Sequence, residues 1–506
     1  MSMTGALLSL IAILGALLFL FLQRRFNCWR RLGIAHDKPS WLLGNLTEVH
    51  RTLSFGDISR NIYLKYKGTG PFCGFFFFLR PAVVLLDIGL IKNVLIKDFT
   101  NFADRGMFNN ERDDPLTGHL FLLDGHKWRS LRGKLTTTFS SGKMKFMFPT
   151  IVEVTHNLVA VLGKQLREDN IVELKEILAR YTTDIIGKVA FGIVCNSLRN
   201  PEAEFRIMGR RAFSEERHGP VVSGFLHSFP SLARRLHMRQ IHDDVTEFFM
   251  RIVRETVEYR EQNNIKCNDF MSILIDLRND KKLRDEFGEE KCLTIEEMAA
   301  QTFVFFIAGF ETSSTTMSFA LYELALQPQL QARLRREVVE TFAKYNNEFP
   351  YECLQEMQYM DQVVAETQRK YTVVPHLNRQ ALNDYTVPGH PNYVIKKGMA
   401  IIVPSAGIHY DPDIYPNPER WDPERFTPAK RAQRETVEWL PFGEGPRSCI
   451  GQRFGRMQIR IGLAHLLRKY RFSVCDKTEI PLKINIKSFL LNTLNGIYLK
   501  VEDLDN

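Results

Sequence analysis

Residues 441–455 read PFGEGPRSCIGQRFG and surround one cysteine, Cys449, with glycines and an arginine. Glycine has no side chain, so Gly443, Gly445 and Gly451 let the backbone turn sharply and approach a flat ligand closely. The sequence after Cys449 predicts a helix, whose N-terminal N–H groups would favour a thiolate. The stretch therefore predicts a loop that holds a planar cofactor. The alternative is a glycine-rich turn around a buried, unreactive cysteine.

The composition of the 506-residue chain is that of a globular protein with a large core. Apolar residues make up 44% and charged residues 25%, which excludes a wholly disordered chain. The net charge of +9 is spread along the sequence, so we expect anionic lipid or acidic protein partners and no nucleic acid. The eight cysteines include no CxxC pair, and we expect them to stay reduced.

An uncharged apolar run near the N-terminus is long enough to span a bilayer. It covers residues 4–22, TGALLSLIAILGALLFLFL. Positive charge tends to stay on the cytoplasmic side, and four arginines follow the run, namely Arg24, Arg25, Arg30 and Arg31. Because residues 1–4 carry no basic side chain, a retained anchor with a cytosolic body is favoured over a cleaved secretory signal.

A long helix is predicted over residues 294–326, opening with a capping-box pattern at Thr294. Residues 308–313 within it read AGFETS. Glycine costs about 1 kcal/mol relative to alanine inside a helix, and a threonine hydroxyl can divert a carbonyl hydrogen bond, so we expect a local distortion. Apolar residues precede the segment, which predicts that Glu311 and Thr312 are buried. A buried carboxylate needs a partner or a function; the alternative is a glutamate on a solvated face.

Two other predicted helices carry residue pairs on one face. Residues 125–139 place Trp128 and Arg132 four positions apart, where an indole N–H and a guanidinium can both donate to a carboxylate. A later helix places Glu366 and Arg369 three positions apart. Taken alone, either pair is an ordinary pair on a helix surface.

Together these patterns resemble the cytochrome P450 family. The cysteine loop matches the haem-binding pattern FxxGxRxCxG through Phe442, Gly445, Arg447, Cys449 and Gly451. The resemblance covers essentially the whole chain and is closest to insect microsomal P450s that metabolise xenobiotics. It implies a mainly α fold with small β-sheets (α+β), formed by one haem-thiolate domain behind an N-terminal membrane anchor.

The resemblance also implies how haem b is held. Cys449 would be the axial thiolate ligand of the iron, and such a ligand pushes electron density toward the metal. Arg447 would pair with a haem propionate. The other cofactor-binding residues that it implies are Arg105, Trp128, Arg132, Arg379 and Phe442. In the helix after the cysteine the chain departs from the usual pattern at Gly455 and Gln458, where alanine and glutamate are common, and neither position is a ligand. The connection over residues 36–45 also has fewer prolines than is usual in the family.

Two further motifs resemble those of the family. The segment AGFET resembles AGxET, in which a helix opens to form an oxygen pocket; Glu311 and Thr312 would then organise water and deliver protons during oxygen activation. Glu366 and Arg369 would join Arg425, from the sequence PERF, to brace the chain beneath the haem loop.

Several segments are implied to surround an apolar substrate pocket. Residues 101–121 would form a loop over it, and a β-hairpin over residues 488–499 would close it with its turn. Residues 221–238 would roof the pocket and contact lipid; the alternative is a plain helix-loop-helix. The side chains expected to line the pocket are Phe108, Phe306, Val373, Val374 and Leu494, and the segment ending at His376 would point into it.

The implied function is a haem-thiolate monooxygenase that inserts one oxygen atom of O2 into a lipophilic small molecule, such as an insecticide, plant toxin, hormone or pheromone. NADPH-cytochrome P450 reductase would supply electrons at the endoplasmic-reticulum membrane, with cytochrome b5 as a second candidate donor. The alternatives are a haem-thiolate isomerase or dehydratase, and a non-catalytic haem or hydrophobe carrier. The pair Glu311 and Thr312 argues against an isomerase, which needs no proton delivery.

Residues from distant parts of the chain must meet at one cofactor, so we expect a single domain over residues 46–506. An anchor over residues 1–23 and a basic, turn-rich connection over residues 24–45 would precede it. A basic face would receive the acidic reductase, and its expected members are Lys127, Arg129, Lys134, Arg453, Arg456 and Arg460.

Overall fold

The computed structural model describes residues 3–505 except 42, 50, 268, 280–282 and 285–289. Helices make up most of the described chain: α1 Met3–Phe26, α2 Cys28–Arg31, α3 Phe55–Tyr66, α4 Ile88–Lys92, α5 Gly125–Leu135, α6 Ser141–Gln165, α7 Leu174–Ile186, α8 Glu204–Ser214, α9 Pro220–Ser228, α10 Pro230–Arg235, α11 Asp243–Gln262, α12 Phe270–Asn279, α13 Ile295–Leu326, α14 Pro328–Lys344, α15 Cys353–Glu356, α16 Gln358–Lys370, α17 Ser405–His409, α18 Pro428–Ala432 and α19 Gln452–Lys469.

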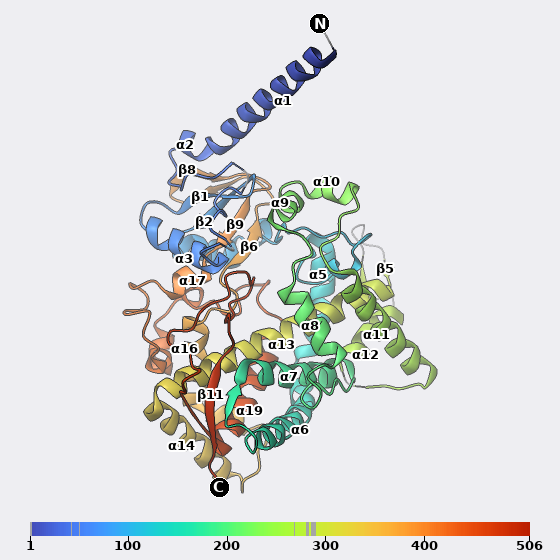
Figure 1. The fold of residues 1–506 in the computed structure, drawn as a ribbon, viewed down its shortest axis with the longest axis vertical. Helices are drawn as coiled ribbons and strands as arrows, with labels where there is room; N and C mark the ends of the chain where they lie inside the picture. Colours follow the sequence, from blue (N-terminus) through green and yellow to red (C-terminus); the bar gives the residue numbers. More distant parts are fainter. Residues whose placement is uncertain are drawn as a thin grey trace.

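The strands are short: β1 Phe72–Phe77, β2 Arg80–Leu85, β3 Ile171–Glu173, β4 Leu283–Arg284, β5 Glu290–Lys291, β6 Leu377–Gln380, β7 Tyr385–Val387, β8 His390–Ile395, β9 Ala400–Val403, β10 Tyr470–Ser473 and β11 Tyr498–Asp503. The largest sheet has the order β1-β2-β9-β6 and is antiparallel except between β2 and β9. It lies at the end of the body next to α1 (Figure 1). The predicted fold class, mainly α with small β-sheets, is confirmed.

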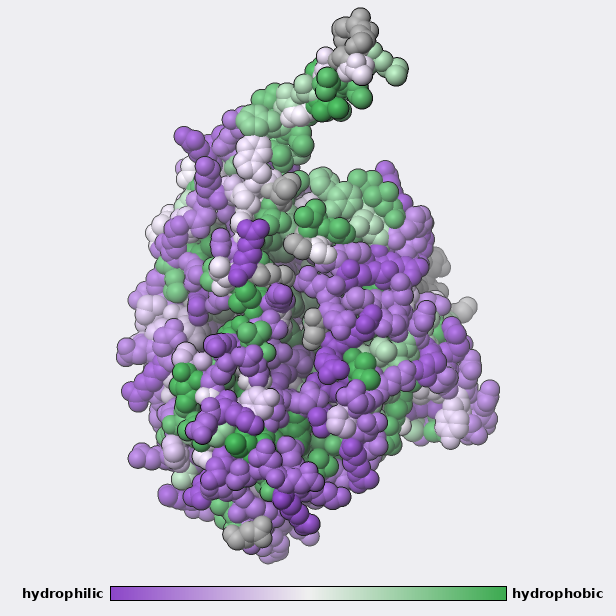
Figure 2. Space-filling view, viewed as in Figure 1, coloured by the Kyte–Doolittle hydropathy of each residue, from purple (hydrophilic) through white to green (hydrophobic). Residues whose placement is uncertain are grey.

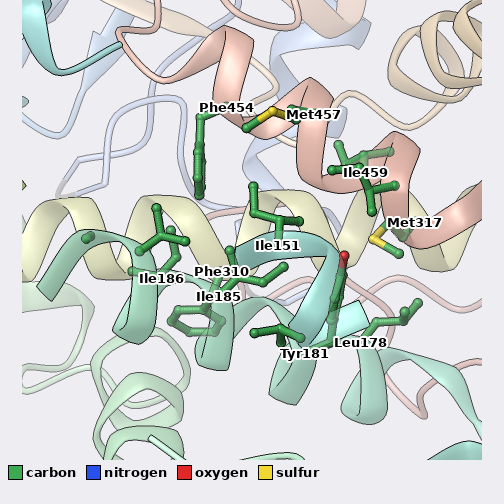
Figure 3. Packing of buried hydrophobic residues seen from close by; sticks show 14 of the residues in the cluster. Ile151, Leu178, Tyr181, Ile185, Ile186, Phe310, Met317, Phe454, Met457 and Ile459 are labelled. Atoms are coloured by element: carbon green, nitrogen blue, oxygen red, sulfur yellow. The ribbon is translucent and has the colours of Figure 1, made fainter. Parts of the chain in front are cut away.

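Helix α13 runs through the centre of the body and packs on α7, α11 and α19. Its N-terminus has the predicted capping box, formed by Thr294 and Glu297. Its C-terminal half is buried nearly all round, because apolar and small residues occupy every face. Figure 3 shows Phe310 and Met317 of α13 among side chains of α7 and α19, including Tyr181 and Ile459.

The local distortion expected at residues 308–313 is absent, because α13 is continuous there. The Thr312 hydroxyl donates to the Ala308 carbonyl at 2.8 Å within an intact helix. A Cβ atom at Gly309 would lie 2.4 Å from Cδ1 of Ile186 on α7. This glycine is therefore explained by the close approach of two helices and not by a break in one of them.

Helix α1 projects from the body with its apolar side chains exposed (Figures 1 and 2). At 1.5 Å per residue its 24 residues span about 36 Å, more than the hydrocarbon core of a bilayer. Among the described residues, two helices are long and apolar enough to cross a membrane, one over Leu7–Phe26 and the other over Ser141–Gln165. The second packs against α7 and α19 in the body and is therefore a core helix.

The segment after α1 folds onto the large sheet. Trp29 is fully buried against Phe72 and Phe76, and its indole N–H donates to the Phe75 carbonyl at 3.2 Å. A Cβ atom at Gly74 would lie 2.4 Å from the indole ring, so this strand position requires glycine. Part of the predicted connection over residues 24–45 thus packs with the body, while the domain limits themselves stay a prediction.

Candidate active site

A cavity of about 290 Å³ lies between α13 and the cysteine loop. It brings together side chains that lie as far apart in the sequence as Arg105 and Phe489. Every predicted site residue except Glu311 lines it, namely Arg105, Trp128, Arg132, Thr312, Arg379, Phe442, Arg447 and Cys449. Cys449 is the one cysteine of the described chain in this lining.

The cysteine loop is fixed by its own backbone. The Cys449 N–H donates to the Phe442 carbonyl at 2.7 Å, which closes the loop. Gly445 has a φ of +75°, and a Cβ atom there would lie 2.0 Å from the Leu95 carbonyl oxygen. Helix α19 begins at Gln452, shortly after the predicted start, with Gly451 as its N-cap residue.

The Cys449 thiol has free surface that opens into the cavity. Burial raises the pKa of this thiol, while the Gly451 N–H and the positive charges of Arg132 and Arg105 lower it. A metal cation bound by this sulfur would stabilise the thiolate further, because metal binding requires the deprotonated form.

Three guanidinium groups at the cavity have donors without partners. The Nε atoms of Arg105, Arg379 and Arg447, and Nη1 of Arg447, are buried and make no hydrogen bond to the described residues. Burial, together with the neighbouring arginines, lowers the pKa of Arg379 to about 9 and that of Arg447 to about 10. Such a cluster of positive charges favours the binding of anions. Carboxylates suit it best, because their two oxygens can accept two parallel hydrogen bonds from one guanidinium. The two propionates of haem fit this donor set.

Trp128 and Arg447 support each other beside the cavity. The Arg447 guanidinium stacks 4.2 Å from the Trp128 ring centroid and donates to the Leu123 carbonyl at 2.7 Å. Asp124 accepts from Arg447 at 3.3 Å and from the Arg105 backbone N–H at 2.8 Å. Sequence reasoning missed Asp124, although its position just before α5 marks it as an N-terminal residue of that helix.

The two predicted proton-delivery residues lie on different faces of α13. Thr312 lines the cavity, whereas Glu311 faces α7 and accepts from Lys175 Nζ at 2.7 Å. Asn492 Nδ2 donates to the same carboxylate oxygen at 3.3 Å. Consecutive helical residues point about 100° apart, so one carboxylate and the next hydroxyl do not face one cavity together. The catalytic role of Glu311 stays a prediction, and Lys175 is a partner that sequence reasoning missed.

The apolar lining differs in part from the prediction. Val373 and Val374 line the cavity as expected. Phe108 packs on Leu226 and Ala233, and Phe306 packs on Phe249 and Phe310, so neither reaches it. The phenylalanines that do line it are Phe121, Phe139, Phe270, Phe305, Phe442, Phe454 and Phe489.

Leu494 is 57% exposed and outside the cavity, because the C-terminal turn lies earlier than predicted. An antiparallel bridge joins Ile484 and Thr493, and the Leu491 N–H donates to the Val373 carbonyl at 3.0 Å. The chain between residues 484 and 493 therefore folds over the cavity and places Phe489 in its wall.

Glu366, Arg369 and Arg425 form the predicted brace. Arg369 donates to Glu366 through two nitrogens, at 2.7 and 2.8 Å, and both side chains are completely buried. Arg425 lies 3.5 Å from the same carboxylate. Arg369 also donates to the carbonyls of His409 and Arg420, so the brace ties α16 to the chain that leads into the cysteine loop.

Three of the six residues of the predicted docking face are engaged in ion pairs or ring contacts within the protein. Lys127 pairs with Glu111 at 3.2 Å, and Arg460 pairs with Asp361 at 3.3 Å. Burial lowers the pKa of Arg456, which stacks on Trp439 and Phe442. The members that are exposed and make no ion pair with the described residues are Arg129, Lys134 and Arg453.

A cysteine with free surface in a cavity, together with arginines whose buried Nε donors have no partner among the described residues, fits a haem-thiolate protein. Residues 35–500 match the family model described as Cytochrome P450. The chain is 54% identical to Cytochrome P450 6a9 of Drosophila melanogaster, over 99% of this chain and 100% of that protein. It is 49% identical to Cytochrome P450 6A1 of Musca domestica, over 98% of this chain and 97% of that one. The chain therefore belongs to the cytochrome P450 family, and it is a monooxygenase that uses haem with a cysteine thiolate ligand.

Proposed function

We propose that this monooxygenase oxygenates lipophilic small molecules, including xenobiotics such as insecticides and plant toxins, with electrons from NADPH-cytochrome P450 reductase. The observation that supports this best is the cavity wall opposite the cysteine loop. It consists mainly of apolar and aromatic side chains, among them Phe121, Val304, Phe305, Val374 and Phe489. Cavities of this kind bind apolar molecules and use a few polar groups for orientation.

Tasks are proposed for Cys449, the arginines of the cavity, Thr312 and Glu311. Haem, when bound, supplies the activation of dioxygen. Cys449 would hold its iron from the loop side, and the arginine donors would fix its propionates and hence its orientation. Thr312 Oγ1 now donates to a backbone carbonyl, and a rotation about χ1 would direct this proton into the cavity. Glu311 would resupply the proton through water, which requires its carboxylate to part from Lys175.

Replacing Thr312 with valine removes this hydroxyl at nearly constant volume. We expect the product formed per NADPH oxidised to fall by about tenfold or more, because a positioned proton donor is lost. The matched control is Thr316→Val, one helical turn further along the same cavity wall, whose hydroxyl donates to the Thr312 carbonyl. If both variants form the same amount of product per NADPH oxidised, Thr312 does not deliver the proton.

Replacing Arg379 with leucine tests the propionate assignment. Its one hydrogen bond within the described chain goes to the adjacent Asn378 carbonyl, so the fold depends little on it. We expect haem to dissociate about 10- to 100-fold faster, as found when supporting contacts of a bound metal are lost. The control is Arg471→Leu, at an exposed ion pair with Glu502. Unchanged haem retention in Arg379→Leu contradicts the assignment.

We propose further that α1 anchors the protein in the endoplasmic-reticulum membrane with the body on the cytosolic side, since arginines follow the apolar run. A second apolar surface supports a close contact with lipid. It consists of exposed residues of α9, α10 and their flanks, at the same end of the molecule as α1 (Figures 1 and 2): Val221, Phe229, Leu232 and Leu236. Figure 2 shows apolar side chains gathered there.

Reconstitution in phospholipid vesicles tests the proposed function. The purified protein is combined with the reductase, with and without cytochrome b5, and NADPH use and oxygenated product are measured over a panel of lipophiles. We expect product formation that requires NADPH and reductase. Rearrangement of a peroxide without reductase would instead indicate an isomerase, and binding without any product a carrier. Charge reversal at Arg129, Lys134 and Arg453 should slow reduction without loss of haem.

A further inference from the structure

His376 lies in the wall of the cavity, in the segment between α16 and β6. Its side chain is buried, and its ring is held by aromatic neighbours on two sides. The ring centroid of Phe55 is 4.2 Å away, and that of Phe489 is 5.9 Å away in an edge-on arrangement. The imidazole is therefore fixed in place by packing and not by a polar contact.

The His376 ring lacks the hydrogen bonds that the other buried imidazoles have. Its Nδ1 atom is buried and has no partner among the described residues. His409 accepts from the Leu440 N–H at 2.8 Å and contacts the Thr372 hydroxyl at 2.7 Å, and His465 bonds to the Ile461 carbonyl at 2.9 Å. His119 accepts from the Leu122 N–H. Buried polar groups are normally satisfied, so an unpaired one at a cavity requires an explanation.

The chemistry of this group follows from its surroundings. Burial lowers the pKa of His376 to about 3, so the imidazole is neutral at physiological pH. A neutral imidazole carries one N–H donor and one nitrogen acceptor. Val373, Val374 and Leu377 of the same segment line the cavity next to it with apolar side chains, whereas Asn378 and Arg379 follow them in the lining. An uncharged hydrogen-bonding group beside such apolar side chains can bind a lipophile with one polar atom more tightly than a hydrocarbon of the same shape.

We propose that His376 is the substrate-binding residue that hydrogen-bonds the carbonyl, ether or hydroxyl oxygen of an otherwise lipophilic substrate. This contact anchors one end of the molecule and so determines which carbon is presented for oxygenation. The inference rests on the proposed function in one respect, namely that a lipophile occupies this cavity. It adds the class of lipophile: molecules with one oxygen function bind better than the corresponding hydrocarbons.

The test compares two probes of nearly equal size, the ketone 1-tetralone and the hydrocarbon tetralin. Binding to the holoenzyme is followed by the shift of the haem absorption band, which needs neither NADPH nor reductase. We expect His376→Phe to weaken the binding of 1-tetralone about 3- to 10-fold, the range for loss of one hydrogen bond, and to leave tetralin unchanged. His376→Gln, which keeps a donor and an acceptor, should restore most of the preference for the ketone.

Two controls make the outcome decisive. Phe489→Leu alters the same wall without removing a polar group, so it should affect both probes alike. If His376→Phe does not retain haem, His376→Leu takes its place. Equal weakening of both probes by these variants, or unchanged binding of 1-tetralone, overturns the proposal. A ketone preference that depends on His376 supports it even if no reductase-driven turnover is found, so failure of the proposed function would be seen separately.

Discussion

Replacing Arg369 with leucine is expected to lower the free energy of unfolding by about 3–5 kcal/mol. The Glu366 carboxylate is completely buried, and it accepts two hydrogen bonds from this guanidinium, at 2.7 and 2.8 Å. The variant would leave the charge in the core with only Arg425 at 3.5 Å and the Asp422 N–H at 2.8 Å. The measurement is denaturant unfolding of the holoenzyme, together with the fraction of purified protein that contains haem.

Lys396→Leu is the matched control, because the ion pair of Lys396 with Asp384 has a similar length but is exposed. Its loss should change the free energy of unfolding by less than about 1 kcal/mol. In Arg369→Leu the destabilisation should shrink as the pH is lowered. Burial already raises the pKa of Glu366, and without its main partner the folded protein would take up a proton there more readily than the unfolded chain does. Equal effects in the two variants would contradict the structural role assigned to the brace.

Replacing Cys449 with alanine is expected to lower monooxygenase turnover by more than about 100-fold. Removing a residue that only hydrogen-bonds a metal ligand typically lowers activity by up to about 100-fold. The loss should be larger here, because the variant removes the ligand itself. The measurement is oxygenated product per haem in the reconstituted system. Cys475→Ala is the control, since Cys475 is partly buried and outside the cavity, near the Thr478 hydroxyl. Turnover that survives in Cys449→Ala would exclude this cysteine as the ligand.

The sequence predicted which residues around the cysteine loop share one cavity, because local geometry holds many of them. The spacing of Trp128 and Arg132 puts both in the cavity wall, and the glycines of the cysteine loop fix the position of Cys449. The brace was also predictable, since Glu366 and Arg369 share one helix face. In each case a short stretch of chain determines the relative placement of its side chains.

The substrate side depended on contacts that a single sequence does not contain. Lys175 of α7 donates a hydrogen bond to the Glu311 carboxylate, which therefore faces away from the cavity. The next residue, Thr312, lines the cavity. Phe305 lines the cavity and Phe306 does not, because one step along a helix turns a side chain by about 100°. The sequence alone could have predicted that Phe305 lines the cavity, because Phe305 lies seven residues before Thr312 and therefore on the same face of the helix. Gly309 is explained only once Ile186 is seen beside it.

The reduced carbon monoxide spectrum of the holoenzyme tests the central claim most directly. Thiolate ligation shifts the Soret band of this complex strongly to the red, because the ligand donates electron density to the iron. We predict the red-shifted band for the native protein and for Cys475→Ala, and its loss in Cys449→Ala. A native protein without this band, or a Cys449→Ala variant that keeps it, would contradict the assignment of Cys449 as the haem ligand.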